Sequence, residues 1–466
     1  NTNVIWESRG HRSLFGARGV SGLVNVEITP ELAVRLASAY ATTLKKGSVV
    51  TTSRDASRAA RALKRAVISA LTASAIDVRD LEVAPTPVTR FDVSVTEAVG
   101  GISLRTTHGD PQSLDIVFFD ANGADLSPAA QRRLERVFYR EEFRRAFPGE
   151  IAELTFPPRA TEQYTQELLH RVDTSGVLEA GLKVVVDTAG GTAALALPTL
   201  LGRLGVEVLT VNGRLDEMHT TETLADHMSG IERLGSLVAS SRSSFGVRFD
   251  HGGERMALVD ERGHLVHDDR ALLVLLDLVA AERGSGTVAL PVTTTRIAEQ
   301  VTRFHGVQTR WTPLSGAELM TAAAEPDVIF AGDGRGGMII PEFASSIDAI
   351  AAFVRLTGLV ARTKLTLSQI DARIPDAHVL RRSVPTPWAT KGLVMRSVVE
   401  AAGTREIDTT DGVRVVEPNG DWALVLPDPA EAVTHLWAEG ADAAAASGLI
   451  EQWAEVVESA GSGASS

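Results

Sequence analysis

Strand-like and helix-like patterns alternate along most of the chain. Residues 49–52 form a short β-rich run, and Asp55 follows as a plausible N-cap for a helix whose apolar positions recur at helical spacing from Ala62 to Leu71. Further along, residues 183–187 are typical of a strand, 193–204 of a helix and 206–211 of a strand. This order predicts parallel strands joined by right-handed crossovers.

Three consecutive α/β units of this kind precede a fourth unit that differs. The first closes with a charged helix over 128–145, the second includes a strand at 245–249, and the third a helix over 270–283 and a strand at 327–331. The repeated plan suggests an internal triplication, although no repeat is visible residue by residue.

The last unit is predicted to be antiparallel. Strands at 413–417 and 422–426 are joined at Asn419-Gly420, a strong hairpin dipeptide, and a strand near 434–438 and a helix over 441–457 follow. The fold class is therefore α/β, with three tandem mixed or parallel-sheet domains and a C-terminal α+β domain. The expected domains are 1–146, 160–263, 264–372 and 373–458, separated first by a linker rich in proline and glycine at 147–159 and ending in a disordered tail at 459–466.

Composition and charge narrow the classes of partner. The chain has 466 residues, 44% of them hydrophobic, and a formal net charge of -13, which repels polyphosphate backbones and argues against nucleic acid as a partner. It has no cysteine, which excludes disulfides, thiolate metal sites and cysteine nucleophiles and fits a reducing cytoplasm. No apolar run approaches the roughly 20 residues that span a bilayer, so no membrane partner is expected.

Four short polar loops carry the candidate chemistry. Their sequences are Arg-Thr-Thr-His-Gly-Asp-Pro at 105–111, Asp-His-Gly-Gly-Glu-Arg at 250–255, Gly-Asp-Gly-Arg-Gly-Gly at 332–337 and Pro-Asp-Pro-Ala-Glu at 427–431. Their order and spacing resemble the four active-site loops of the α-D-phosphohexomutases, the phosphoglucomutase/phosphomannomutase family. Residues 15–22, which include Arg18, look like the family's opening Phe-Gly-Thr-Ser-Gly-Ile-Arg-Gly, and Ser53-Arg54-Asp55 looks like its Gly-Arg-Asp. The resemblance implies the four-domain phosphohexomutase fold, with a cleft where the loops meet.

The first loop implies catalytic roles for Thr107 and His108. Aligned on the histidine, Thr107 stands where the family holds the serine that carries phosphate. A threonine hydroxyl can carry phosphate, but its methyl group stiffens the side chain and crowds the in-line path. Asp110 adds a negative charge beside that position. The alternative is a polar turn without chemistry.

The second loop implies magnesium at Asp250 and Glu254. The family's Asp-Gly-Asp-Gly-Asp-Arg brings three carboxylates to Mg²⁺, whereas here the middle one is Gly252 and the last is Glu254. Mg²⁺ often needs only one or two carboxylates beside a phosphate, so binding at this pair is conceivable. The alternative is a tight turn after a strand.

The remaining loops imply how a sugar phosphate would be held. Asp333 can accept hydrogen bonds from sugar hydroxyls, and Arg335 replaces a family serine with a fork of donors suited to phosphate or carboxylate. The loop at 427–431 lacks both arginines and every hydroxyl of the family's phosphate clamp. The substrate-binding candidates are Arg18, Arg54, Arg255, Asp333 and Arg335.

Two functional hypotheses follow from the resemblance. In the first, the chain is an inert or feeble module that binds a sugar phosphate or nucleotide and regulates or assembles a mannose-1-phosphate guanylyltransferase of GDP-mannose metabolism. Residues 3–10 look like the exit from the β-helix of such an enzyme, so an upstream nucleotidyltransferase and β-helix are expected, and the chain lacks a nucleotidyltransferase loop of its own. In the second, it is an active phosphomannomutase or phosphoglucomutase that uses phosphorylated Thr107. Homo-oligomer formation stays open in both.

Overall fold

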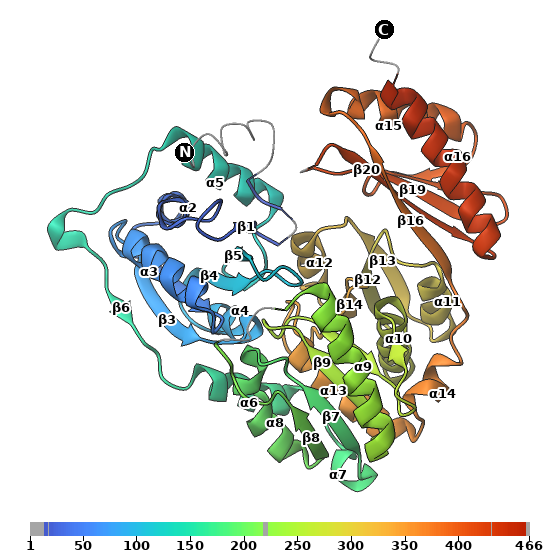
Figure 1. Ribbon diagram of the computed structural model, residues 1–466, viewed down its shortest axis with the longest axis horizontal. Coiled ribbons are helices and arrows are strands. Elements are labelled where there is room, and N and C mark those ends of the chain that lie inside the picture. Colours follow the sequence, from blue (N-terminus) through green and yellow to red (C-terminus); the bar gives the residue numbers. More distant parts are fainter. Residues whose placement is uncertain (1–13, 17, 218–221, 430, 463–466) are drawn as a thin grey trace.

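The computed structural model describes residues 14–16, 18–217, 222–429 and 431–462, although nothing is described for the Ser462 side chain. Four β-sheets follow one another along the chain, each with its own helices (Figure 1). In the view of Figure 1 the first sheet lies at the left, the second at the bottom, the third at the right and the fourth above the third. Residues 3–10, which look like the exit from a β-helix, lie outside the described residues.

The first unit is a six-stranded sheet in the order β1-β5-β4-β2-β3-β6. Its strands are β1 (Val20–Leu23), β2 (Val49–Arg54), β3 (Asp77–Val83), β4 (Ala98–Thr106), β5 (Ser113–Phe119) and β6 (Leu154–Thr155), and its helices are α2 (Pro30–Thr43), α3 (Arg58–Thr72), α4 (Thr86–Val95) and α5 (Pro128–Arg140). Residues 147–159, predicted as a linker, thus contribute the edge strand β6, which pairs with β3.

Two local predictions in this unit were wrong. Helix α3 is capped by Ser57, whose side chain accepts the Ala60 amide, and not by Asp55. Asp55 instead accepts the Thr106 amide through Oδ2 at 2.6 Å, so it fastens the end of β2 to the start of the first polar loop. Helix α5 stops at Arg140 because Glu141 adopts a left-handed conformation, with φ 57°, that ends the helix five residues earlier than expected.

The second and third units follow the same plan. The second contains α6 (Ala160–Arg171), α7 (Val177–Ala180), β7 (Lys183–Asp187), α8 (Leu197–Leu204), β8 (Glu207–Val211), α9 (Leu224–Ser241), β9 (Phe245–Phe249), β10 (Met256–Val259) and β11 (Leu265–Val266). The third contains α10 (Asp268–Arg283), β12 (Thr287–Pro291), α11 (Ile297–Phe304), β13 (Gln308–Thr312), α12 (Gly316–Ala323), β14 (Val328–Gly332), β15 (Met338–Ile339), α13 (Ala349–Thr363) and α14 (Leu367–Asp371).

The order of the strands confirms the triplication at the level of topology. The runs β3-β2-β4-β5, β8-β7-β9-β10 and β13-β12-β14-β15 are equivalent: three parallel strands, then one antiparallel strand. The first three polar loops each join the third strand of a run to the antiparallel fourth. Equivalent hairpins therefore present all three loops.

The fourth unit is an antiparallel sheet, as predicted, and it carries two helices where the sequence predicted one. Its elements are β16 (His378–Pro385), α15 (Lys391–Ala402), β17 (Glu406–Asp408), β18 (Val413–Val416), β19 (Trp422–Pro427), β20 (Val433–Gly440) and α16 (Ala443–Ser462). The predicted hairpin at Asn419-Gly420 joins β18 to β19, and Gly420 takes φ 93°. Helix α16 extends to Ser462, so the first four residues of the tail predicted to be disordered are helical.

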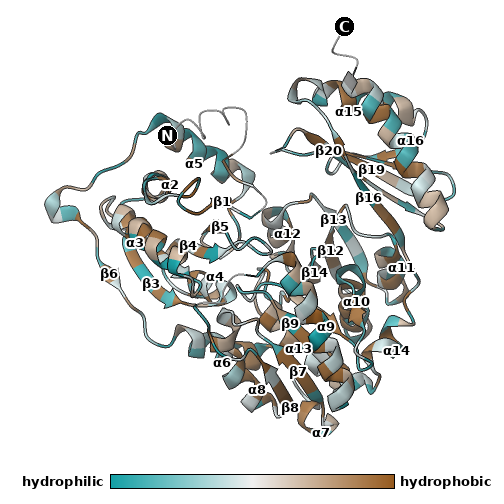
Figure 2. Ribbon diagram, in the orientation of Figure 1, coloured by the Kyte–Doolittle hydropathy of each residue, from teal (hydrophilic) through white to brown (hydrophobic). Residues whose placement is uncertain are grey.

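Buried apolar residues form clusters inside the units, and one cluster includes residues of the first three units. Hydrophobic residues recur along the strands and helices of all four units (Figure 2). The buried ring of Tyr164 on α6 packs against Phe91 of α4 and Phe343 of the third unit, with ring centroids 5.7 and 5.3 Å away. One junction therefore ties three units together. No helix within the described parts of the chain is long and apolar enough to cross a bilayer.

A buried carboxyl at this junction makes stability depend on pH. Tyr164 Oη donates to Asp348 Oδ2 at 2.7 Å, and burial raises the pKa of Asp348 from 3.8 to about 6. The folded carboxyl holds a proton that the unfolded one has released, so stability is expected to fall by about 2–3 kcal/mol as the pH rises from about 4 to about 6. Asp348→Asn should flatten this slope in urea unfolding series, while Asp376→Asn, at a carboxylate 88% exposed, should keep it. An unchanged slope in Asp348→Asn would contradict the assignment.

Candidate functional site

The first three polar loops meet, and ion pairs join them. Arg105 at the end of β4 pairs with Glu254 of the second loop, and Arg255 of the second loop pairs with Asp333 of the third at 2.7 Å. A backbone bridge between Arg255 and Gly337 adds a second link between the second and third loops. The sequence prediction that these loops lie together is thus correct for three of them.

Thr107 is buried, and its hydroxyl makes a hydrogen bond to a carboxylate. Its Oγ1 donates to Asp115 Oδ1 at 2.6 Å, and its amide bonds to the carbonyl of Ser113 at 3.0 Å. Asp115 faces the first loop because it stands opposite Arg105 in the register of β4 and β5. Ser21 also donates to Asp115 Oδ1, at 2.6 Å. The hydroxyl at the family's phosphoryl position therefore lies in hydrogen-bond contact with a buried carboxylate.

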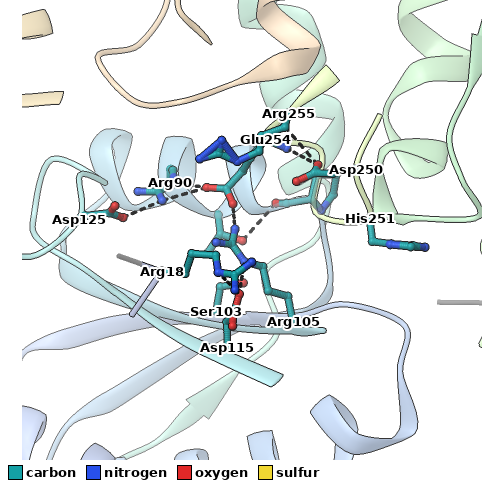
Figure 3. Close-up of polar contacts among 12 residues, drawn as sticks. Arg18, Arg90, Ser103, Arg105, Asp115, Asp125, Asp250, His251, Glu254 and Arg255 are labelled. Carbon is teal, nitrogen blue, oxygen red and sulfur yellow. Dashed lines mark hydrogen bonds and ion pairs between the residues drawn. The ribbon is translucent and has the colours of Figure 1, made fainter. Parts of the chain in front are cut away.

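A chain of guanidinium and carboxylate groups fills the centre of the site (Figure 3). Arg90 on α4 donates through Nε and Nη2 to Glu254 Oε1 at 3.1 and 2.9 Å, and through Nη2 to Asp125 at 2.7 Å. Arg105 contacts the other oxygen of Glu254 and lies 3.8 Å from Asp115. Burial lowers the pKa of Arg105, although the neighbouring carboxylates oppose this shift. Both oxygens of Glu254 are thus paired with arginine.

The donor set at Asp250 and Glu254 does not fit magnesium. Asp250 Oδ1 accepts the amides of Glu254 and Arg255 at 2.8 and 3.2 Å, Gly252 offers no side chain, and guanidinium groups take both Glu254 oxygens. Mg²⁺ demands near-octahedral oxygen ligands, and the two positive charges beside Glu254 would repel it. The residues predicted as metal ligands lie on one loop, but they form ion pairs and a turn.

The predicted sugar-binding residues of the third loop differ in whether their side chains are already paired. Asp333 is occupied: it pairs with Arg255 and accepts the amides of Arg335 and Gly337 at 2.8 and 3.0 Å. The Arg335 side chain is exposed and makes no hydrogen bond or ion pair within the described ranges. Gly334 and Gly336 on either side take positive φ, 66° and 82°, which lets the loop turn tightly around it.

The other predicted residues lie around the first loop. Arg18 is exposed, donates to the His108 carbonyl at 3.5 Å and lies 4.0 Å from Asp115. Arg54 ends β2 and donates to the Asp55 carbonyl at 2.7 Å. Burial lowers the pKa of His108, whose ring stands perpendicular to that of His227 at 4.8 Å.

The fourth loop carries no cation that could clamp a phosphate. Asp428 pairs with His435 at 3.0 Å, and Ser383 contacts the second ring nitrogen of that histidine at 2.8 Å. Lys391 donates to the backbone carbonyls of Asp428 and Glu431, so its ammonium group stabilises the conformation of this loop. The loss of both clamp arginines, inferred from the sequence, leaves a carboxylate at this position.

Sequence reasoning missed the residues that hold this centre together. Arg90, Asp115 and Asp125 are not among the functional residues predicted from the sequence, and Arg105 belongs to the first loop without a predicted role. The available signal was the register of the first hairpin, which could have placed Asp115 opposite Arg105. No spacing relates Arg90 to Glu254, 164 positions apart.

Comparison with known proteins agrees with this architecture. Residues 12–145, 162–263 and 267–377 match the models described as phosphoglucomutase/phosphomannomutase, alpha/beta/alpha domains I, II and III. The chain is 27% identical over 453 residues to a phosphoglucomutase/phosphomannomutase of Thermococcus kodakarensis, covering 96% of this chain and 99% of that one.

Solved structures show the same fold. A phosphoglucomutase/phosphomannomutase family protein of Burkholderia thailandensis superposes with a TM-score of 0.84 at 19% identity, covering 97% of this chain and 98% of that one. An Aspergillus fumigatus N-acetylphosphoglucosamine mutase, described in complex with GlcNAc-6P and magnesium, superposes at 0.61 with 12% identity and covers 99% of each chain.

Proposed function

Because the chain belongs to the phosphoglucomutase/phosphomannomutase family of α-D-phosphohexomutases, we propose that it uses the family's fold to bind a sugar phosphate without transferring its phosphate. The observation that carries the proposal is the pairing of both Glu254 oxygens with Arg90 and Arg105. Charges that could act on a phosphoryl group neutralise one another instead. The loops that surround the site keep the positions that the fold gives them, while the charged groups of the site pair with one another.

The surroundings of Thr107 support the same conclusion. A phosphate on Oγ1 would place a dianion against the buried carboxylate of Asp115, 2.6 Å from that oxygen. Repulsion between like charges is severe where water is excluded. Arg105 lies 3.8 Å from Asp115 but is committed to Glu254. Within the described ranges, the other arginine that pairs with Asp115 is the exposed Arg18, whose Nε lies 4.0 Å from it.

Arg335 is the proposed anchor for the ligand. A guanidinium group offers a fork of donors that matches phosphate, and this one makes no ion pair within the described chain. The glycines beside it allow the ligand to approach the backbone of the third loop. The ligand class that fits is a hexose monophosphate, and a nucleotide is an alternative outcome of the same binding test.

Magnesium has no step in this proposal. The ligands that the family resemblance implies are Asp250 and Glu254, and the guanidinium of Arg105 takes the place of a cation beside Glu254.

We further propose, from the sequence resemblance alone, that the module serves a mannose-1-phosphate guanylyltransferase as a regulatory or assembly element. Co-elution with that enzyme in size-exclusion chromatography is expected, and separate elution would remove this part of the proposal.

The second candidate function is an active phosphomannomutase or phosphoglucomutase. The observation in its favour is the contact between Thr107 Oγ1 and Asp115 Oδ1, because an activated hydroxyl nucleophile needs a base at this distance. The two functions differ in whether Thr107 ever carries phosphate.

Binding without phosphate transfer is the expected result. The protein is incubated with mannose 1-phosphate and a hexose bisphosphate, and intact-mass spectrometry should find no phosphate on Thr107. Calorimetry should detect binding of mannose 1-phosphate, and Arg335→Ala should weaken it about tenfold, because a hydrogen bond to a charged group contributes about 1.5–3 kcal/mol. Arg303→Ala, at an arginine 81% exposed on α11, is the matched control. Stoichiometric phosphate on Thr107 would favour the second candidate instead.

A further inference from the structure

Two histidines and a glutamate gather beside the first loop, outside the ion-pair network. His108 comes from that loop, while in the second unit Glu222 lies just before α9 and His227 lies within its first turn. One ring nitrogen of each histidine and one carboxylate oxygen of Glu222 all lie within 4.8 Å of one another. Glu222 Oε1 and His227 Nδ1 are 2.9 Å apart. Three side chains of ligating type thus converge from two units.

Buried ring nitrogens without partners point to a ligand here. His108 Nδ1 is buried and has no hydrogen-bond partner among the described residues. The same holds for Nε2 of His251, a side chain only 7% exposed. Leaving a buried polar atom unsatisfied costs about 1–3 kcal/mol, so such atoms call for a partner. In Figure 3 the His251 ring projects away from Glu254 and Arg105, and it is close enough to influence the pKa of both His108 and Glu222.

A second layer of contacts orients the glutamate. Arg248 is buried and donates to the other oxygen of Glu222, and it also pairs with Asp187. Asp187 in turn accepts from Asn212 at 2.9 Å. Metal-ligating carboxylates are commonly fixed in this way by hydrogen bonds from outside the ligand set.

We propose that His108, Glu222 and His227 bind a divalent transition-metal ion, for which Zn²⁺ is the best-matched probe. Two imidazoles and a carboxylate suit Zn²⁺, whereas Mg²⁺ prefers oxygen ligands alone. Ligands about 2.0–2.1 Å from a tetrahedral ion lie roughly 3.3–3.5 Å apart, so modest side-chain rotations from the present spacing would complete the site. The ion would fasten the first loop to α9, joining the first two units beside Thr107.

The test measures metal binding and does not depend on substrate, so its failure and that of the sugar-phosphate proposal are separable. Metal-stripped protein is titrated with Zn²⁺ against a chromophoric chelator, and a single ion per chain is expected. His227→Ala should weaken binding by more than about tenfold. His264→Ala, at a side chain 76% exposed, is the matched control and should bind as the native chain does.

Two further readouts keep the result unambiguous. Zn²⁺ should raise the thermal midpoint of the native protein and of His264→Ala but not of His227→Ala, because only an ion bound to the folded state stabilises it. His108→Gln replaces His227→Ala if the latter does not fold, since it alters the site from the other unit. Absence of stoichiometric Zn²⁺ binding, or equal binding by the native chain and the site variant, would overturn the proposal.

Discussion

Glu254→Ala is expected to lower the free energy of unfolding by about 3–5 kcal/mol, because it leaves the buried Arg90 and the largely buried Arg105 without their shared carboxylate. Arg90 would keep Asp125 and the Gly123 carbonyl, but Arg105 would keep, among the ion pairs of the described residues, the more distant Asp115. Breaking a buried ion pair costs far more than the pair contributes, since the remaining charge stays desolvated. Urea unfolding followed by circular dichroism measures the loss.

A matched control compares the loss of stability at this buried ion pair with the loss at an exposed ion pair. Glu451→Ala removes one of the two carboxylates that pair with Arg382 on the surface of the fourth unit, and the side chains of Glu451 and Arg382 are 63% and 36% exposed. An exposed pair contributes about 0–1 kcal/mol, so this variant should unfold nearly as the native chain does. The double variant Arg105→Met with Glu254→Leu should recover part of the loss, because it removes the charges of Arg105 and Glu254 together while Arg90 keeps its pair with Asp125. Equal, small losses in Glu254→Ala and Glu451→Ala would show that the cluster is solvated and not structural.

The sequence predicted those parts of the fold whose causes are local. Strand β9 (Phe245–Phe249) and the Asn419-Gly420 hairpin followed from patterns a few residues long, and the structure confirms both. The cap of α3 did not follow, because Asp55 and Ser57 are both good capping residues and the choice depends on Thr106, 51 positions away. Local capping propensity cannot choose between Asp55 and Ser57, because a hydrogen bond from the distant Thr106 amide engages Asp55.

The site shows the same limit more sharply. The resemblance placed Thr107, Asp250 and Glu254 on their loops. The sequence alone does not distinguish a carboxylate that binds a metal ion from one that pairs with an arginine. The partners that decide the matter, Arg90 and Arg105, lie in another unit from Glu254. The pairing of His108 with His227 and Glu222 is likewise non-local, because it needs the first loop and α9 in contact. Charge balance within the folded site could not be predicted without the fold.

Turnover of hexose phosphates is expected to be lower by about 10³–10⁶ than in a family member with a complete phosphate clamp. Three charged hydrogen bonds of about 1.5–3 kcal/mol each are missing, on the order of 5–9 kcal/mol together, and each 1.4 kcal/mol corresponds to about tenfold in rate. The structure supports this deficit at the fourth loop, where Asp428 faces His435 and Lys391 binds backbone carbonyls.

The measurement compares this chain with its Thermococcus kodakarensis relative in one coupled assay, with glucose 1-phosphate, mannose 1-phosphate and a bisphosphate primer. Thr107→Ala is the decisive variant, because an inert site loses nothing when its hydroxyl is removed and a mutase loses all turnover. Residual conversion that is equal in the native chain and Thr107→Ala therefore counts as background. A native rate near that of the relative, abolished by Thr107→Ala, would mean that Asp115 serves Thr107 as a base and that the ion pairs around Glu254 open during the reaction.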